Sequence, residues 1–315
     1  MLFYIIHVAG LLYSENIDIG LFSLQKKIPL LIFPLILGSL KQNLLSKQQV
    51  NLVITCFVIA CAIVSLFNVF DQSVFFIHPT YLGMYIIFAT GFLLTLTAKK
   101  NIFLVLPFVL LVLATSILLS SRITLIILVL EINAFFIVHS FISKKFIPII
   151  VLILLNIVGI WGVLNYPPTR EKFDKLIEFR GDYIRERNWR SNIKVISNHM
   201  IMGVGIGDAT AELQKARDPT WHEAVFKYNS HNLYLQLFVE LGIVGLCVLL
   251  FCLIYPTFIT LENGNVFYLI FIVSFCLPSL TESTLGLQKG TVYYGFFNSF
   301  LFLFGNNAKR VKDYI

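Results

Sequence analysis

His231 and Asn232 stand where a long polar segment, residues 167–230, gives way to an apolar run. Gln236 and Glu240 follow Asn232 in steps of four residues. On a helix such steps drift by only about 40°, so these three side chains share one face. A polar face in an apolar helix is costly in lipid and should face protein or a wet cavity. Because histidine titrates near neutral pH, His231 is a candidate to accept a proton from a hydroxyl group.

Arginine suits the binding of phosphate, because its planar guanidinium matches pairs of phosphate oxygens. Arg122 stands at a tight turn between two long apolar runs, and Arg185, Arg187 and Arg190 cluster in the polar segment. Arg122 is interpreted either as an arginine that extends from the membrane interface into water or as an anion-binding residue. The clustered arginines fit either a mixed-charge helix on the membrane surface or the same anion site.

Glu282 lies with Lys289 in a polar stretch between the last two apolar runs. Three interpretations are open for this glutamate. It faces the same cavity as His231 and Arg122, it caps the next helix, or it pairs with Lys289.

The composition indicates a protein that resides in a membrane. Hydrophobic residues make up 57% of the 315 residues and charged residues 13%, and the mean hydropathy is +0.83. Soluble domains carry about 25% charged residues. The net charge of +7 is spread over short loops rather than gathered in one stripe, which argues against a nucleic-acid partner. The sequence therefore predicts an integral membrane protein whose partner is the lipid bilayer.

No sequence pattern for a metal or an organic cofactor is visible. All five cysteines fall in apolar runs, and no second histidine follows His222-Glu223 at zinc spacing. The glycine-rich segment 203–207 lacks the strand and the Gly-Lys-Ser/Thr ending of a phosphate loop. It predicts a tight turn, followed by a short helix that Asp208 caps. We therefore expect no cofactor and no metal site.

Ten apolar runs predict an all-α, polytopic membrane protein with about ten transmembrane helices. They lie at residues 1–13, 28–40, 50–70, 79–97, 102–120, 122–142, 146–165, 232–254, 266–283 and 292–305. This pattern divides the chain into a transmembrane bundle at 1–166, a long loop at 167–230 and C-terminal transmembrane helices at 231–315. Trp189, Ile193 and Ile196 recur at helical spacing, which predicts that the loop is partly helical.

Lysines and arginines in the short loops predict the orientation of the helices. With the loop at 167–230 on the outside, nine of these residues fall on the inner side and four in outer loops, so both termini are cytoplasmic. Lys26 and Lys27 are two of the four outer residues and fit this arrangement poorly. Their position indicates either that segment 28–40 is re-entrant or that the first span is incomplete.

Three segments, in this order, carry a resemblance to a known family. They are Ser120-Ser121-Arg122; Arg185 and Trp189, followed by Asn198 to Asp208; and Asn229 to Gln236, followed by Glu240-Leu241-Gly242 and Gly245. With them the sequence resembles the O-antigen ligase and O-antigen polymerase superfamily of bacterial membrane glycosyltransferases, over most of its length. It departs from the family at Met200, where proline is usual.

The resemblance implies an enzyme with a GT-C-like helical bundle that works without a metal ion. Its donor would be an oligosaccharide on undecaprenyl pyrophosphate. Its acceptor would be lipid A–core for a ligase, or another lipid-linked glycan for a polymerase, and the choice between these two stays open. The reaction would take place at the periplasmic face of the bacterial inner membrane.

The resemblance and the chemistry together predict a role for eight residues. His231, Arg122 and Arg185 are expected to be catalytic, the histidine as base and the arginines as counter-charges of the leaving pyrophosphate. Those expected to bind substrate are Arg190, Arg187, Asn232, Gln236 and Glu282. The alternative function, a transporter or flippase of lipid-linked sugars, predicts charged residues deep in many spans and an internal repeat, and neither is evident.

Overall fold

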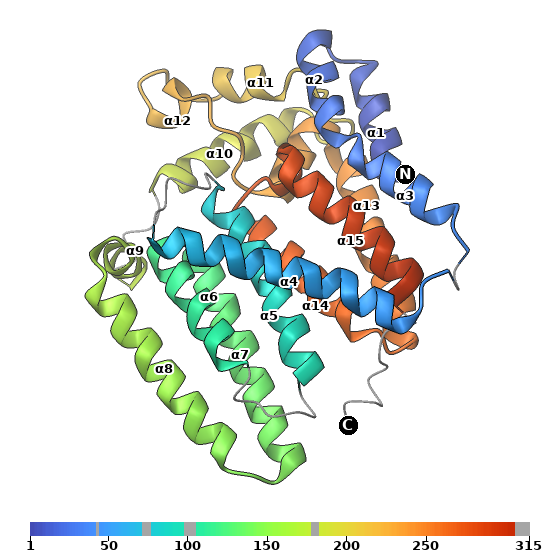
Figure 1. The fold of residues 1–315 in the computed structure, drawn as a ribbon. Helices are drawn as coiled ribbons and strands as arrows, with labels where there is room; N and C mark the ends of the chain where they lie inside the picture. The colour runs from blue at the N-terminus through green and yellow to red at the C-terminus, as the bar shows by residue number, and fades with distance from the viewer. Residues whose placement is uncertain (42–43, 71–76, 98–104, 178–182, 306–315) are drawn as a thin grey trace. The chain divides into compact units, whose positions relative to one another are not determined.

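The computed structural model describes residues 1–41, 44–70, 77–97, 105–177 and 183–305 (Figure 1). These residues form α-helices joined by turns and short 3₁₀ turns, without a strand among them, which confirms the all-α prediction. The helices group into two compact units, and each is described by itself. Unit 1 contains Met1–Leu44, Arg180–Glu262 and Ser279–Leu303, and unit 2 contains Leu45–Phe179, Asn263–Pro278 and Phe304–Ile315.

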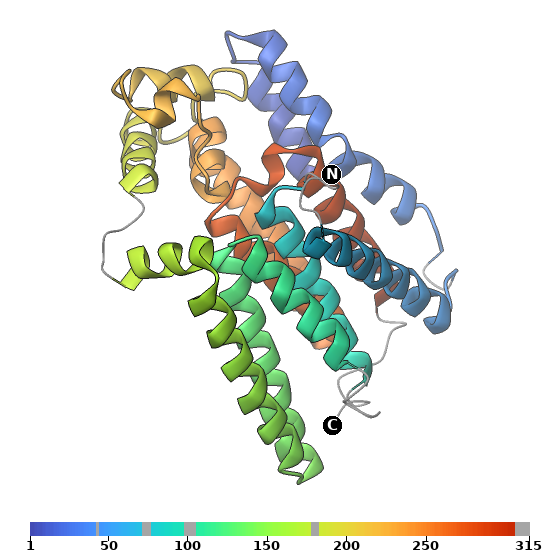
Figure 2. The same ribbon diagram turned by 60° about the vertical axis from the view of Figure 1, so that its left-hand side comes forward.

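Unit 1 is organised around its longest helix, α13. Both α1 and α10 pack along α13, and α1 is seen beside it in Figures 1 and 2. Apolar side chains of α10, α11 and α13 form one shared core. The helices are α1 (Leu2–Leu11), α2 (Ile17–Lys27), α3 (Pro29–Gly38), α10 (Tyr183–Asn198), α11 (Ala209–Lys215), α12 (His222–Val225), α13 (Leu233–Glu262) and nearly all of α15 (Gln288–Phe304).

Unit 2 has a buried helix, α5, at its centre, and α4, α7 and α14 pack around it. Gly83 and Gly91 make the close approach to α7 possible, because a Cβ at these positions would collide with Thr124 and Glu131. α8 lies along α7, which Figure 2 shows in green. The helices are α4 (Lys47–Phe70), α5 (Pro79–Thr97), α6 (Leu106–Leu118), α7 (Arg122–Ser143), α8 (Ile147–Asn165), α9 (Pro167–Ile177) and α14 (Val266–Cys276).

Six helical stretches in the described part of the chain are long and apolar enough to cross a membrane. They are Ile17–Gly38, Lys47–Phe70, Pro79–Thr97, Arg122–Ser143, Ile147–Asn165 and Leu233–Glu262, and shorter apolar helices lie at Leu2–Leu11, Leu106–Leu118 and Val266–Leu280. The chain is therefore a multi-pass membrane protein. The total of ten spans, the three-part division of the chain and the side on which segment 167–230 lies stay predictions.

The structure corrects the expected position of Lys26 and Lys27. We expected both in a short outer loop, but α2 and α3 join through Ile28 into one helical stretch, so both lysines lie in its middle. Lys27 is buried, with 4% of its surface exposed, and its Nζ donates to Ser23 Oγ over 2.8 Å. The charge is tolerated inside the helix because it has polar partners there.

α13 is interrupted at Gly242, whose backbone angles (φ 63°, ψ −161°) suit glycine alone. The break takes two carbonyls and two N–H groups out of the helical ladder, and segment 200–205 binds all four over 2.9–3.5 Å. The residue pairs, donor first, are Val204 with Val239, Gly205 with Glu240, Ile243 with Met200, and Val244 with Ile201. The glycine-rich segment is therefore more than the tight turn that we expected, because it is inserted into the backbone of α13.

Asp208 stands at the N-cap position of α11, as predicted, but its side chain does not cap that helix. Its carboxylate accepts the N–H groups of Glu15 (2.7 Å) and Asn16 (3.0 Å), where α2 begins. The first N–H groups of a helix have no partner within it, so a carboxylate is stabilised there. Asp208 thus links the start of α2 to the segment that completes α13.

Candidate functional site

His231 lies in unit 1, in the turn that leads into α13, with its backbone in the left-handed region (φ 45°). Its N–H donates to Asn229 Oδ1 over 2.9 Å, which holds the turn. Its side chain is 26% exposed, so a substrate can reach it. The imidazole and the ring of Tyr228 meet nearly at right angles, with 5.2 Å between the ring centroids.

Glu282 is the acidic partner of His231, and its side chain is only 8% exposed. Its Oε2 lies 3.2 Å from His231 Nδ1, and its Oε1 accepts the N–H of Ser283 over 3.0 Å. Because a carboxylate oxygen accepts, Nδ1 carries the proton in this pair, and in the neutral imidazole Nε2 is then the nitrogen with the free lone pair. The structure thus brings Glu282 to His231, while the three interpretations of this glutamate, and its predicted contact with substrate, stay predictions.

Asn232 and Gln236 fix the backbone on both sides of His231. Asn232 Oδ1 accepts the N–H groups of Tyr234 (2.9 Å) and Leu235 (3.1 Å), which makes it the N-cap of α13, and its Nδ2 donates to the carbonyl of Leu280 (3.1 Å). Gln236 Oε1 accepts the N–H of Ser230 over 3.0 Å. Both side chains thus have structural contacts beside the site, and their predicted contact with substrate stays a prediction.

Glu240 continues the polar face of α13 into a buried cluster that we did not predict. Gln236 Nε2 donates to Glu240 Oε1 over 2.7 Å. Glu240 Oε2 lies 3.9 Å from both His7 Nε2 and Lys27 Nζ, whose side chains are buried. The poor fit of Lys27 to the expected topology was the sequence signal for this cluster, because a lysine that lies inside a span needs an acidic partner.

Arg187 forms a buried ion pair with Glu223 of α12. Its Nε lies 3.0 Å from Oε1 and its Nη2 lies 3.0 Å from Oε2, which is a two-pronged contact. The guanidinium also covers the ring of Trp221, 4.7 Å from the ring centroid. In this structure Arg187 therefore fastens α12 to α10, and its predicted binding of substrate stays a prediction.

Arg217 is a buried arginine that sequence reasoning missed. It donates to the carbonyls of Tyr228 (2.8 Å) and Glu223 (3.3 Å) and to Asn188 Oδ1. Burial lowers the pKa of its guanidinium, and the charge of Glu223 opposes that shift. These bonds hold segment 217–228, whose last residue, Tyr228, contacts His231. Nothing in the sequence distinguished Arg217 from a surface arginine.

Arg185 and Arg190 lie on α10, the helix that supports the His231 turn. Trp189 Nε1 donates to the carbonyl of Ser230 over 3.2 Å, and Arg185 is half-buried one turn earlier on the same helix. Arg190 is exposed and pairs with Glu186 over 2.6 Å. The first turns of α10 are thus anchored next to His231, while the roles of the two arginines stay predictions. The predicted helix is confirmed, but Ile193 on its expected apolar face is 58% exposed.

Arg122 belongs to unit 2 and is the first residue of α7, directly after the expected turn. Its Nη1 donates to the carbonyl of Lys172 over 3.2 Å, and Lys172 Nζ donates to the carbonyl of Ser120 over 3.0 Å. Two cationic side chains therefore gather where α6 ends and α7 begins. An anion at this point would meet both charges.

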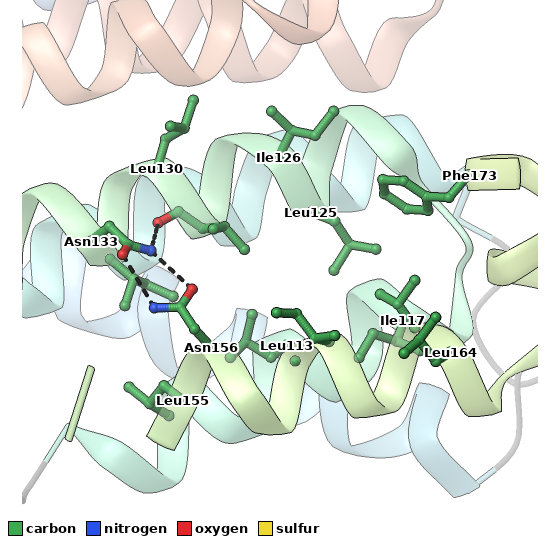
Figure 3. A pocket seen from close by; sticks show the side chains of 15 residues that line it. Leu113, Ile117, Leu125, Ile126, Leu130, Asn133, Leu155, Asn156, Leu164 and Phe173 are labelled. Atoms are coloured by element: carbon green, nitrogen blue, oxygen red, sulfur yellow. Dashed lines mark hydrogen bonds between the residues drawn. The ribbon is translucent and has the colours of Figure 1, made fainter. Parts of the chain in front are cut away.

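An apolar groove of about 430 Å³ lies within unit 2, between α6, α7 and α8. Figure 3 shows aliphatic side chains along it, with Leu125, Ile117 and Leu164 near Phe173 at one end. Asn133 and Asn156 pair their amides over 3.2 Å at the other end. Phe173 directly follows Lys172, so the groove starts beside the cationic turn.

No group of three or more histidine, cysteine, aspartate or glutamate side chains that could hold a metal ion occurs in the described part of the chain. A comparison with models of protein families matches residues 80–250, more than half of the chain, to the family described as O-antigen ligase. This region contains Arg122, Arg185 and His231, whereas Glu282 follows it. The comparison with curated proteins gives no match. From the family match, we conclude that the chain belongs to the O-antigen ligase family.

Proposed function

We propose that the protein transfers a glycan from undecaprenyl pyrophosphate to an acceptor hydroxyl at the periplasmic face of the bacterial inner membrane. Membership of the O-antigen ligase family supports the reaction class. The observation that carries the mechanism is the contact between His231 Nδ1 and Glu282 Oε2 at 3.2 Å. With Nδ1 donating to this carboxylate, we propose that Nε2 of the partly exposed neutral imidazole accepts the proton.

In the proposed reaction the acceptor oxygen attacks the anomeric carbon of the donor glycan. The bond from that carbon to the pyrophosphate oxygen breaks, and undecaprenyl pyrophosphate leaves with the bonding electrons. The hydroxyl proton moves to His231 Nε2, and the anomeric centre is inverted by this direct displacement. The Glu282 carboxylate stabilises the imidazolium that forms, and such base assistance contributes about 10²–10⁴-fold in rate.

The leaving pyrophosphate gains negative charge, which arginines can stabilise. We propose that Arg122 and Arg185 bind it, with Arg190 as a further contact on α10. We propose that Arg187 acts on the site through α12, because Glu223 already engages its guanidinium. The polyprenyl tail would occupy the apolar groove of unit 2, which starts beside Arg122 and Lys172.

The test replaces each of His231, Arg122 and Arg185 with alanine in the source strain. We expect loss of the surface polysaccharide while the protein remains in the membrane. Matched controls are His199→Ala and Arg170→Ala, because both residues are exposed and lie outside the proposed site. Polysaccharide would be visualised on gels, and the protein by immunoblot of membrane fractions.

The gel pattern also separates the possible outcomes. Intact core without any O-chain would indicate a ligase, and caps of a single repeat would indicate a polymerase. Normal polysaccharide from all three variants would refute the proposed glycan-transfer activity. Precursor confined to the cytoplasmic leaflet would favour a flippase instead.

A further inference from the structure

Three aromatic rings lie close together, and Tyr228, the last of them in the sequence, meets the ring of His231. The centroid of His222 lies 4.4 Å from that of Phe226 and 5.4 Å from that of Tyr228. Phe226 and Tyr228 are 6.2 Å apart, and Tyr228 is 5.2 Å from the ring of His231. We call His222, Phe226 and Tyr228 the aromatic row. All three belong to unit 1 and come from α12 and the turn after it.

The aromatic row is exposed although it would gain free energy from burial. Phe226 is 62% exposed, His222 is exposed and Tyr228 is half-buried. Exposed rings that are grouped beside polar groups, rather than scattered singly, are a feature of ligand-binding surfaces. The aromatic row is therefore suited to bind a ligand that has an apolar face.

The backbone under the row is held rigidly. Glu223, next to His222, is fully buried in its ion pair with Arg187, and Arg217 binds the carbonyl of Tyr228 over 2.8 Å. These contacts fix α12 from below and leave the rings on the outer side. A ligand that binds the row needs little ordering of the protein, which favours binding.

A pyranose ring fits this surface. One face of the sugar carries C–H groups that pack on the negative face of an aromatic ring, and its edge carries hydroxyls that can reach polar groups. That the bound sugar is the acceptor rests on the proposed transferase function. In the proposed reaction, His231 must meet the hydroxyl whose proton it accepts, and that hydroxyl belongs to the acceptor sugar.

We propose that the aromatic row is a saccharide-binding subsite that holds the acceptor sugar next to His231. The donor is not the occupant. Its reacting carbon is bonded to the pyrophosphate oxygen and carries no hydroxyl whose proton His231 could accept. Phe226 carries the stacking contact, since its ring is exposed and is the only one of the three without a polar atom. Tyr228 directs the stacked sugar towards the imidazole.

The test measures sugar binding directly, with the full chain in lipid nanodiscs. The probes are the methyl glycosides of galactose, glucose, rhamnose and N-acetylglucosamine at millimolar concentration, observed by saturation-transfer NMR. We expect at least one glycoside to receive saturation on the C–H protons of one face. Phe226→Ala should raise its Kd about two- to tenfold, and Tyr228→Leu should act in the same direction. Phe226→Trp should retain binding.

Val225→Ala is the matched control, because Val225 is as exposed as Phe226 (62%) and adjacent to it. It should leave the saturation signal unchanged. No signal from any of the glycosides, or a signal that Phe226→Ala and Tyr228→Leu leave intact, would overturn the subsite. The chain has three tryptophans of its own. Stronger quenching by brominated lipid in Phe226→Trp than in the wild type would also overturn the subsite, because the ring would then be a membrane anchor.

The binding experiment is repeated with His231→Ala, which separates the subsite from the reaction. Sugar binding by this variant supports the subsite even if its surface polysaccharide is normal and the transferase proposal fails. Absent binding together with lost polysaccharide would leave the transferase standing and remove the subsite. In purified enzyme, Phe226→Ala should raise the KM for the acceptor and leave kcat unchanged, as expected for a contact equally strong in ground and transition states.

Discussion

His231 is held by its neighbours in a conformation that histidine rarely adopts. A left-handed backbone at a residue other than glycine costs on the order of 1–3 kcal/mol and persists only where the surroundings enforce it. Here the Asn229 side chain accepts its N–H, and Glu282 accepts from the ring. The two contacts fix the residue at both ends. Such a cost is typical of a position where geometry matters for chemistry.

The Glu282 contact predicts a specific kinetic defect for Glu282→Gln. The amide can donate a hydrogen bond to Nδ1, which would place the ring proton on Nε2 and remove the base. We expect kcat to fall by roughly 10²-fold or more, with little change in the KM for the acceptor.

The measurement is steady-state glycan transfer by protein of equal abundance in the membrane. Glu262→Gln is the control, because Glu262 is an exposed carboxylate at the far end of α13. A kcat equal to that of the wild type would mean that Glu282 does not position His231. A normal kcat with a raised acceptor KM would assign Glu282 to substrate binding.

At the scale of elements, the break in α13 explains why one sequence segment contains so many glycines. The segment must run close to another backbone in order to exchange hydrogen bonds with it. A Cβ on Gly203 would collide with the backbone at Glu240 and Leu241, and one on Gly242 would collide with Ile201. Both glycines also have positive φ angles, of 69° and 63°.

Gly242→Ala should therefore destabilise unit 1. The side chain meets the carbonyl of Ile201 in a backbone region that only glycine occupies readily, and such strain costs at least about 2 kcal/mol. We expect a lower midpoint of thermal unfolding in detergent. Gly38→Ala, at the end of α3, is the control, because a Cβ there meets nothing within 4 Å. Equal midpoints for the two variants would show that the inserted segment contributes little to stability.

Local patterns predicted the elements well but not the contacts between distant segments. Spacing along α13 placed Asn232, Gln236 and Glu240 on one face, and the hydrogen bond between Gln236 and Glu240 agrees with it. The partners His7 and Lys27 lie more than 200 residues away in the sequence. The hydrogen bonds between segment 200–205 and the break in α13 likewise have no signal in the sequence except the glycines. A glycine pattern fits many kinds of turn.

At the scale of the whole molecule, the correction of Lys26 and Lys27 strengthens the predicted orientation. Both residues leave the outer loops, since they lie in the middle of a helical stretch. The sequence then has nine basic residues on the predicted inner side and two, Arg122 and Lys289, on the outer side. Of the nine inner residues, Lys99, Lys100, Lys309, Arg310 and Lys312 lie outside the described residues.

In unit 2, charged residues at the two ends of α7 indicate which end faces which side of the membrane. α7 and α8 form a hairpin whose turn carries Lys144 and Lys145, and Arg122 begins α7 at the opposite end. With 22 residues in α7, these ends are about 33 Å apart, roughly the thickness of the hydrocarbon layer. Lys145 and Arg122 should therefore face opposite sides of the membrane, with Lys145 in the cytoplasm.

Cysteine labelling tests this orientation. In a background with the five native cysteines replaced by alanine, a cysteine replacing Thr220 should react with a membrane-impermeant thiol reagent in intact spheroplasts. Thr220 is exposed in the segment before α12, which the proposed function requires on the periplasmic side. Lys145, which is also exposed, should react as Lys145→Cys only after lysis. The reverse pattern would place His231 in the cytoplasm, where a periplasmic acceptor cannot reach it, and would refute the proposed reaction.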